Sequence, residues 1–252
     1  MTNEALESRP LRDIVTENFR TAEVFERHGL DFCCQGKQTL GEACAERGID
    51  AASITRELHD LGDRRGQQFA EWSPGLLVEY IIQHHHTYVR EKIPVLAAHT
   101  EKIASVHGER HPELIRIADI FKQVASEMQF HMLKEERMLF PYIKALAAAR
   151  GGRGNLDRPP FGTIWNPIAM MESEHESAGS GLGEIRSLSS NYTIPGDACT
   201  TYRVTYQELR EFEQDLHQHV HLENNILFPK SIALEEQVFE EAPSTFSKEV
   251  HP

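Results

Sequence analysis

The sequence predicts an all-α protein in which an up-down four-helix bundle follows a small three-helix domain. Apolar residues recur at helical spacing along most of the chain, and cap residues, glycines and prolines divide these stretches. No segment in the second domain shows a competing strand pattern of alternating apolar and polar residues. The fold class therefore follows from periodicity and from the residues that interrupt it.

The amino-terminal region, residues 1–66, is expected to form the small domain. Pro10 suits the first turn of one helix, and Gly29 suits the end of that helix. After a turn, Thr39 and Asp50 are typical caps for two further short helices. These signals predict three helices that pack into a compact unit.

A polar, glycine-punctuated stretch separates this domain from the bundle, and we assign residues 67–73 to the linker. The bundle is expected over residues 74–240, and residues 241–252 are expected to be a disordered tail. Long helices joined by short connections fit a bundle whose interior can build a metal site. The four predicted helices are 74–106, 111–149, 163–190 and 198–236. Three prolines late in helices should kink or end them, namely Pro94, Pro141 and Pro229.

Composition excludes several classes of function. A formal net charge of −13, without a basic stripe, disfavours nucleic acid as a partner. No apolar run approaches the roughly 20 residues that a membrane span requires. No secretory signal is visible at the amino terminus, so a cytoplasmic location is expected by default. The four cysteines are too few and too unevenly placed for a disulfide framework, and we expect reduced thiols.

An internal repeat gives the strongest functional lead. His131 and Glu135 open one copy of the pattern His-x-x-x-Glu-x-x-x-Leu-Phe-Pro, and His219 and Glu223 open the other. The two copies are offset by 88 residues, so the second and fourth helices resemble duplicated elements. A spacing of four residues places imidazole and carboxylate on one helix face. Two such helices facing inward would bring two histidines and two glutamates together.

The first and third helices should each supply a partner at matching distance. His175 lies 44 residues before the histidine of the second copy, and His86 lies 45 residues before that of the first. His84 and His85 are rivals, but the repeat offset favours His86. The first and third helices would thus complete a set of four histidines and two glutamates.

Other side chains near the repeat have weaker claims. His217 and His221 lack a carboxylate four residues later, which favours a flanking polar surface. Glu174 adjoins a candidate ligand, and Glu127 precedes the first repeat by one helical turn. Either glutamate is a candidate hydrogen-bond acceptor for a ligand or a proton carrier. Surface salt bridging is the equally weighted alternative.

Four histidines and two glutamates are too many for one structural zinc, which prefers four ligands. Two metals fit better, because bridging by Glu135 and Glu223 gives each metal two imidazoles and two carboxylate oxygens. A bridging oxo or hydroxo group would make five ligands and leave one position open. Imidazole with carboxylate suits iron, although manganese or zinc would be accepted. The expected ligands are His86, His131, Glu135, His175, His219 and Glu223.

The bundle residues resemble the hemerythrin-like domain family. The segment from Asp31 to Leu40, with vicinal Cys33 and Cys34 before Gln-Gly-Lys-Gln-Thr-Leu, is similar to the signature domain of the iron-sulfur cluster repair di-iron proteins. The resemblance implies a hemerythrin-like bundle with four histidines and two bridging glutamates at the same six positions. Oxygen-carrying hemerythrins have an additional histidine and lack the cysteine domain. Phe32 stands where some members have tyrosine.

The resemblance also implies a function. Members help to restore iron-sulfur clusters damaged by nitric oxide or oxidants, which suggests iron donation and damaged iron-sulfur proteins as partners. Reduction of nitric oxide to nitrous oxide at the di-iron centre is one alternative, and a module that binds or senses O2 or NO is another. A metal-free or zinc-binding interaction protein is the remaining reading. A small domain on a linker also permits a homodimer.

The vicinal cysteines have two interpretations. A turn could expose Cys33 and Cys34 as thiolates, helped by Lys37, for redox or iron-transfer duty. They could instead be idle thiols, and a disulfide between neighbours would be strained. The resemblance favours the functional interpretation. Cys44 and Cys199 look ordinary.

Overall fold

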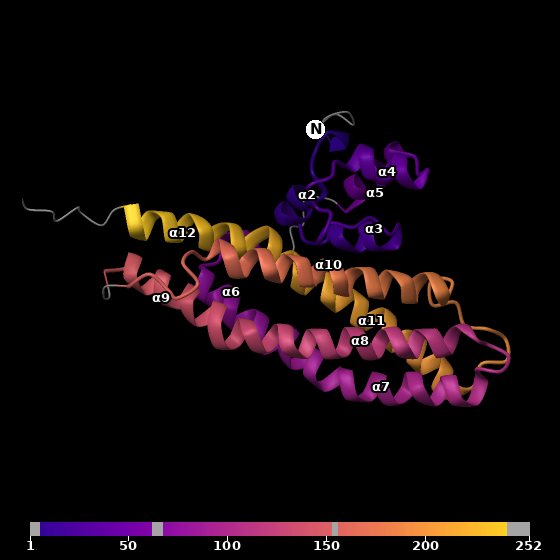
Figure 1. Ribbon diagram of the computed structural model, residues 1–252. Coiled ribbons are helices and arrows are strands. Elements are labelled where there is room, and N and C mark those ends of the chain that lie inside the picture. The colour runs from indigo at the N-terminus through magenta and orange to yellow at the C-terminus, as the bar shows by residue number, and fades with distance from the viewer. Residues whose placement is uncertain (1–5, 62–67, 153–155, 241–252) are drawn as a thin grey trace, which may run out of the picture.

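The structure, a computed structural model, is helical throughout the residues that it describes (Figure 1). The predicted all-α class is confirmed, and within this part of the chain β pairing is limited to one bridge between Pro10 and Thr39. The expected tail at residues 241–252 and the first linker residue lie outside the described residues. The structure describes residues 6–61, 68–152 and 156–240.

The small domain contains a break that the sequence prediction missed. The single helix expected from Pro10 to Gly29 is wrong, because Asn18 has extended backbone and its carbonyl accepts a hydrogen bond from Thr21 Oγ1 at 2.8 Å. Asparagine commonly leaves helical backbone, since its side chain competes for local hydrogen bonds. The helices are α2 (Leu11–Glu17), α3 (Thr21–Arg27), α4 (Leu40–Arg47) and α5 (Ala51–Asp60).

The two predicted caps of this domain are confirmed. Thr39 and Glu42 form a reciprocal capping box at the start of α4, in which each side chain accepts a backbone N–H of the other residue. Asp50 accepts the N–H of Ala52 at 3.1 Å and caps α5. Gly48 ends α4 with a φ of 65°, where a side chain would be strained.

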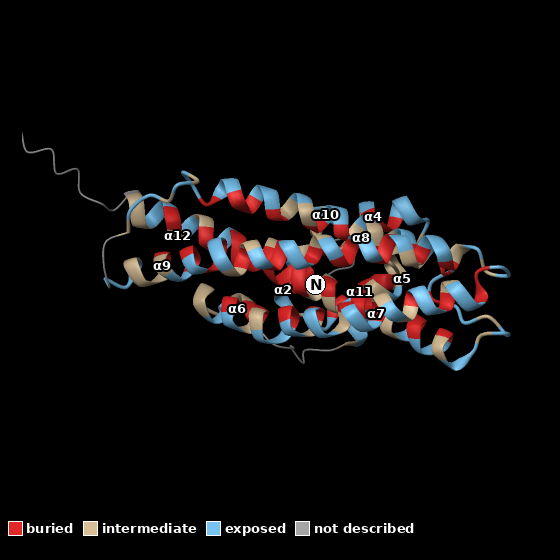
Figure 2. Ribbon diagram, turned by 60° about the horizontal axis from the view of Figure 1, so that its bottom comes forward, coloured by how far each residue is buried: buried red, intermediate tan, exposed pale blue. Residues whose placement is uncertain are grey.

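The bundle consists of four long helical segments, three of which contain one π-helical turn. Their apolar residues form buried stripes that face one another (Figure 2). The first segment is α6 (Pro74–Ile81), η2 (Ile82–His86) and α7 (Thr87–His107), and the second is α8 (Glu113–Lys134), η3 (Glu135–Leu139) and α9 (Phe140–Arg150). The third is α10 (Trp165–Leu188), and the fourth is α11 (Thr200–Leu222), η4 (Glu223–Leu227) and α12 (Phe228–Glu240).

The prolines occupy two kinds of position. Pro141 and Pro229 lie in the first turns of α9 and α12, each directly after a π-helical turn. A proline lacks an N–H and crowds the carbonyl four residues earlier, so a change from π to α geometry accommodates it. Pro94 lies inside α7, which continues to His107.

The small domain is seated on the bundle. It lies against α10 and α11 (Figure 1), and the core of buried apolar side chains is continuous from Phe25 and Phe32 into the bundle. Within the region expected to be a linker, Phe69 begins the 3-10 turn η1 (Phe69–Glu71) and is 4% exposed, with its ring 5.4 Å from that of Phe19. This contact joins the connection to the small domain, and the ring of Tyr80 in α6, 5.1 Å from that of Phe69, joins it to the bundle.

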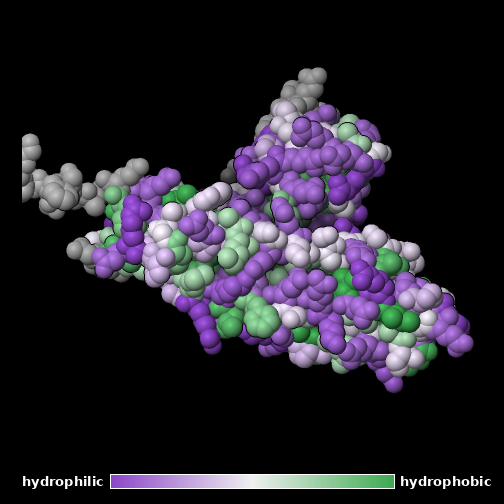
Figure 3. All heavy atoms as spheres, in the orientation of Figure 1, coloured by the Kyte–Doolittle hydropathy of each residue, from purple (hydrophilic) through white to green (hydrophobic). Residues whose placement is uncertain are grey.

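The outer surface is mixed in character. Hydrophilic residues predominate on the visible face of the small domain, and hydrophobic residues are scattered over the bundle between hydrophilic ones (Figure 3). The largest exposed apolar side chains include Phe130 at 65% and Trp165 at 55%. Over the described residues, no helix is long and apolar enough to cross a membrane.

Candidate metal centre

The six side chains predicted as ligands converge in the bundle interior. One is 1% exposed and the other five have no exposed surface. All four helical segments contribute, so the cluster exists only when the bundle is folded. The six are His86, His131, Glu135, His175, His219 and Glu223.

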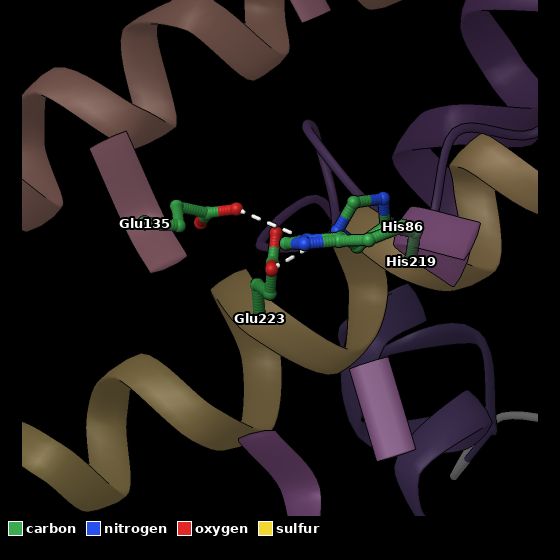
Figure 4. Close-up of side chains that lie close together, drawn as sticks. All are labelled: His86, Glu135, His219 and Glu223. Atoms are coloured by element: carbon green, nitrogen blue, oxygen red, sulfur yellow. Dashed lines mark hydrogen bonds and ion pairs between the residues drawn. The ribbon is translucent and has the colours of Figure 1, made fainter. Parts of the chain in front are cut away.

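The ligand atoms fall into two groups that share both glutamates. In each group, one atom per residue lies within 4.8 Å of all the others. Figure 4 shows one group, in which both carboxylates extend toward the imidazoles. Two cations held by these groups would lie side by side with both carboxylates common to them. The groups are His86, Glu135, His219 and Glu223, and His131, Glu135, His175 and Glu223.

Three of the four helical segments place one ligand each in a π-helical turn. His86 ends η2, Glu135 begins η3 and Glu223 begins η4. A π turn adds one residue to a helical turn, and such turns are frequent at functional sites. The third segment is the exception, since its His175 lies in the uninterrupted α10, and His131 and His219 lie in the α-helices that precede η3 and η4. The π turns therefore mark three of the six ligands independently of the repeat.

Short distances join carboxylates and imidazoles both within and between helical segments. Glu135 Oε2 lies 3.3 Å from Nε2 of both His86 and His131. Glu223 Oε2 lies 3.1 Å from His175 Nε2, and the Nε2 atoms of His131 and His175 are 3.0 Å apart. Neither carboxylate oxygen of Glu135 has a hydrogen-bond partner in the described residues. Buried oxygens and nitrogens that face one another in this way fit a cation as their common partner.

The charges of the cluster also favour a cation. Burial raises the pKa of Glu135, but ion pairing with His131 and His86 outweighs it and leaves the pKa lowered. Burial lowers the pKa of His131, but the charge of Glu135, 3.3 Å away, is the largest of the contributions that outweigh burial and raise it to about 10. Glu223 likewise has a pKa well below its usual range despite burial, chiefly because of His219. The cluster thus contains ionised carboxylates that require positive charge beside them.

The first and second helical segments form one helical hairpin, and the third and fourth form the second hairpin. Two ligands have hydrogen-bond acceptors that belong to their own hairpin. His86 Nδ1 lies 2.6 Å from Glu136 Oε1, and His175 Nδ1 lies 2.8 Å from Asn224 Oδ1. Such partners fix the ring orientation and leave Nε2 free for the metal side. Glu136 and Asn224 directly follow the two glutamates and share their offset of 88 residues. Sequence reasoning missed both, although the repeat carried this signal.

Glu174 has the role of acceptor that the sequence suggested, and Glu127 does not. His131 Nδ1 lies 2.9 Å from Glu174 Oε2, and Lys134 contacts the other oxygen. Hydrogen bonding to His131 lowers the pKa of Glu174 to about 2. Glu127 instead accepts from Ser177 at 3.1 Å, away from the ligands. Gln123 also donates to Glu127 at 2.9 Å, so the contacts of this carboxylate are with neutral side chains and not with a ligand.

The fourth ligand histidine has a different neighbour. Nδ1 of His219 has no hydrogen-bond partner among the described residues. The ring of His85 lies nearly parallel to that of His219, at 5.4 Å between centroids, and His85 Nδ1 lies 3.0 Å from Asp215 Oδ1. His85, a rival to His86 in the sequence, is thus buried beside the cluster rather than in it.

The repeated Leu-Phe-Pro also has a structural role. Phe140 stacks on His86 at 5.6 Å, and Phe228 stacks on His175 at 6.2 Å. Each phenylalanine therefore covers a ligand of the preceding helix in its own hairpin. These rings exclude water from the outer side of the cluster and restrict the rotation of the two imidazoles.

The cysteine segment of the small domain lies next to the cluster. The Cys34 thiol donates to the backbone carbonyl of His175, with a distance of 3.7 Å. Asp31 Oδ1 accepts from the Cys33 thiol at 3.2 Å. The carboxylate of Asp31 and the thiols of Cys33 and Cys34 lie close enough together to hold a metal ion. The Cys34 hydrogen bond, burial and Asp31 raise the pKa of Cys33 well above its usual value. The expectation that both thiols are exposed thiolates is therefore wrong for Cys33, which is 4% exposed.

A polar contact holds this segment in place. Asn225 Nδ2 donates to the carbonyl oxygens of Phe32 at 3.2 Å and Cys33 at 3.4 Å. His221 lies beneath, fully buried, with its ring 5.7 Å from that of Phe32, and burial lowers its pKa to about 3. The prediction of a polar surface at His221 is wrong because the small domain covers it. His217 is half-buried at the same junction.

Comparison with known proteins identifies the class first. Residues 78–231 match the hemerythrin HHE cation binding domain, and residues 7–62 match a domain described as being of unknown function, DUF542. The chain is therefore a hemerythrin-type cation-binding protein with an additional amino-terminal domain.

Full-length relatives define the family more closely. The iron-sulfur cluster repair protein YtfE of Enterobacter sp. (strain 638) is 34% identical over 230 residues, which cover 91% of this chain and 99% of the relative. YtfE of Musicola paradisiaca (strain Ech703) is 37% identical over 216 residues, covering 84% of this chain and 91% of that protein. The chain belongs to the YtfE family of iron-sulfur cluster repair proteins.

Proposed function

We propose that the chain holds two iron ions at the six-residue cluster and supplies iron to damaged iron-sulfur clusters. The observation that carries the proposal is the sharing of Glu135 and Glu223 by two ligand groups. Imidazole with carboxylate is a donor set that suits iron, and the printed name of the relatives is iron-sulfur cluster repair protein. Damaged iron-sulfur proteins are the proposed partners.

Each residue has a defined task in this proposal. When bound, the iron ions supply Lewis acidity and redox chemistry. Glu135 and Glu223 would bridge the two positions, and the imidazoles of each group would hold one position. Glu136, Glu174 and Asn224 would orient three of the imidazoles through Nδ1.

The raised pKa values of two ligand histidines are consistent with a site that can release iron. Departure of a cation leaves ionised Glu135 and Glu223 in a buried environment, which is costly unless other positive charge replaces it. The raised pKa values of His86 and His131 supply that charge, because protons can take the place of the departing cation. The protein would therefore keep its fold while it gives up iron.

The thiols are placed to take part in transfer. Asp31, Cys33 and Cys34 form a second group of potential ligands against the backbone of His175. Cys34 and Asp31 also line an open cavity of about 430 Å³ between the small domain and α10. We propose that iron passes from the cluster to these groups and then to a client protein.

The first experiment is to measure the metal content per chain of protein purified without added metal or chelator. Two irons per chain are expected. Zinc alone, or no metal, would contradict the di-iron proposal. Iron transfer is then measured as loss of iron from the protein and gain of activity by an apo iron-sulfur enzyme, with free ferrous iron at equal concentration as the reference.

The thiol proposal needs a separate comparison. Replacing Cys33 and Cys34 together by serine should leave two irons per chain but slow the transfer to the apo enzyme. Cys44→Ser, which removes a buried thiol elsewhere in the small domain, is the matched control. Equal transfer by the double variant and the control would make the vicinal thiols dispensable.

The same preparation discriminates the alternatives. If nitric oxide is reduced with an added electron donor over many turnovers while the iron content stays constant, nitric oxide reduction is the better description of the site. If O2 or NO binds reversibly without transfer or turnover, the protein is a sensor. Loss of iron to the acceptor, with no sustained nitrous oxide production, would support donation.

A further inference from the structure

A second histidine and cysteine pair lies at the far end of the bundle. His107 Nε2 is 3.2 Å from Cys199 Sγ, which joins the end of α7 to the beginning of α11 (Figure 1). The 21 residues of α7 separate this pair from His86, a span of roughly 30 Å along the helix. The pair is therefore remote from the metal cluster.

The two members differ in access to solvent. Cys199 is exposed, so a reagent in solution can reach its sulfur. His107 is 5% exposed, and its Nδ1 has no hydrogen-bond partner in the described part of the chain. A buried imidazole with a single polar contact has its ring nitrogen committed to that contact. Here the contact is the thiol.

The position of Cys199 in the backbone is the second feature of this pair. Cys199 is the N-cap residue of α11, a helix of 23 residues, and its side chain makes no capping hydrogen bond. The first turn of α11 contains no acidic residue that would neutralise the partial positive charge of the helix end. Thiolates are favoured at helix N-termini and beside imidazoles. Both conditions are met at this one sulfur.

Two carboxylates at this end, those of Asp197 and Glu113, are already paired. Asp197, two residues before Cys199, lies 3.0 Å from both Arg110 and His111. His111 also contacts Glu113 at 3.1 Å. The nearby carboxylates are thus balanced by cations and do not leave His107 as their partner.

We propose that Cys199 and His107 form a reactive thiol site that undergoes reversible mixed-disulfide formation with small disulfides. The proton of Cys199 passes to His107 Nε2, and the sulfur attacks one sulfur of the disulfide. A new sulfur–sulfur bond forms while the old one breaks, and the departing thiolate takes the proton. The sulfur of Cys199 passes from the thiol to the disulfide oxidation level, and one sulfur of the small disulfide passes from the disulfide to the thiol level, so no further oxidant is needed.

The other cysteines provide internal comparisons. Burial raises the pKa of Cys44, which is 1% exposed, and Cys33 is buried with a raised pKa for the reasons given above. Cys34 is half-buried and donates to a backbone carbonyl. Cys199 is the most accessible of the four thiols and has a proton acceptor beside it.

The test uses the full-length protein and an aromatic disulfide that releases a coloured thiolate. At pH 6.5, peptide mapping should find Cys199 labelled first, at least about tenfold faster than an unstructured cysteine peptide. His107→Gln should reduce this rate to that of the peptide. His99→Gln, on the same helix but paired with Glu208, is the matched control and should keep the fast rate.

The order of labelling in the unmodified chain provides a second measurement that does not depend on any variant. At pH 6.5, Cys199 should be labelled before Cys34, Cys33 and Cys44. A Cys199 rate equal to that of the peptide, or one that is unchanged in a folded His107→Gln variant, would overturn the proposal. Labelling is read directly, so the outcome is independent of iron content.

Discussion

The two hairpins of the bundle carry the same ligand pattern in different surroundings. His86 and His175 are each covered by a phenylalanine of the repeat, and both glutamates begin a π-helical turn. The groups behind the ligands differ, since His86 has a carboxylate from Glu136 and His175 has an amide from Asn224. The repeat therefore explains the inner face of the cluster but not its outer face.

The hairpins also differ in what covers them. The small domain contacts the second hairpin through Cys34 and Asn225 at positions beside its ligands. Between hairpins, His131 has Glu174 as acceptor, whereas the corresponding nitrogen of His219 faces no acceptor in the described residues. The two ligand groups thus have similar ligands but different hydrogen-bond partners behind them. The cysteine domain lies beside the second hairpin.

The largest expected effect tests what the hairpins share. Replacing either Glu135 or Glu223 by Ala should remove most of the metal, because each carboxylate belongs to both ligand groups. Metal per chain is measured by elemental mass spectrometry, with Glu127→Ala as a control for removal of a nearby carboxylate. Full metal retention in both cluster variants would refute the ligand assignment. Loss in one alone would show that the hairpins contribute unequally.

The next effect tests the acceptor between the hairpins. Glu174→Gln removes the charge that faces His131, and loss of such partners typically weakens metal binding by about tenfold or more. Iron affinity is measured by competition with a coloured chelator. Glu127→Gln removes the same charge one helical turn before His131 and should bind iron as the unmodified chain does. Equal affinities of the two variants would remove Glu174 from the site.

A smaller effect concerns the cover on the second hairpin. Asn225→Ala removes the donor to Phe32 and Cys33, with an expected cost of about 1 kcal/mol. Amide exchange of residues 31–34 should become about fivefold faster, while metal content stays constant. Asn166→Ala, which removes an amide donor to Phe161 within the bundle, should leave that exchange unchanged. Unchanged exchange in Asn225→Ala would mean that other contacts hold the small domain.

The smallest effect lies where the two hairpins meet at their far end. Hydrogen bonding to Asp197 raises the pKa of His111, with a further contribution from Glu113. A raised folded-state pKa stabilises the fold fully below the usual histidine value and loses that contribution as the pH rises through the raised value. Asp197→Asn should therefore lower the His111 pKa in an NMR titration and flatten the dependence of unfolding free energy on pH. An unchanged titration would show that Asp197 does not set this pKa.

Much of the fold could be predicted because local signals and periodicity agreed with it. Thr39 and Asp50 cap helices as expected. The six candidate ligands predicted from the repeat lie together in one interior cluster. Features that depend on tertiary contacts could not be predicted in the same way. His221 reads as polar surface until the small domain is placed over it, and Asn18 breaks a helix whose apolar spacing continues through it.

The remaining omissions have different causes. Glu136 and Asn224 could have been found by extending the repeat by one position. The π-helical turns could not have been found from the sequence. A π turn and an α turn are formed by the same helix-forming residues, so composition does not distinguish them. Cys199 looked ordinary because its partner, His107, is 92 residues away.

The π-helical turns make chain length itself a determinant of the site. Each residue advances an α-helix by about 100°, so deleting one residue between Glu223 and Leu227 would turn everything after it by that angle. Every ligand would remain in the sequence, yet Phe228 would no longer lie over His175, and α12 would present another side to its neighbours. A chain that lacks one residue at this point would therefore be expected to lose the arrangement of its metal ligands, although all of its histidines and glutamates would still be present.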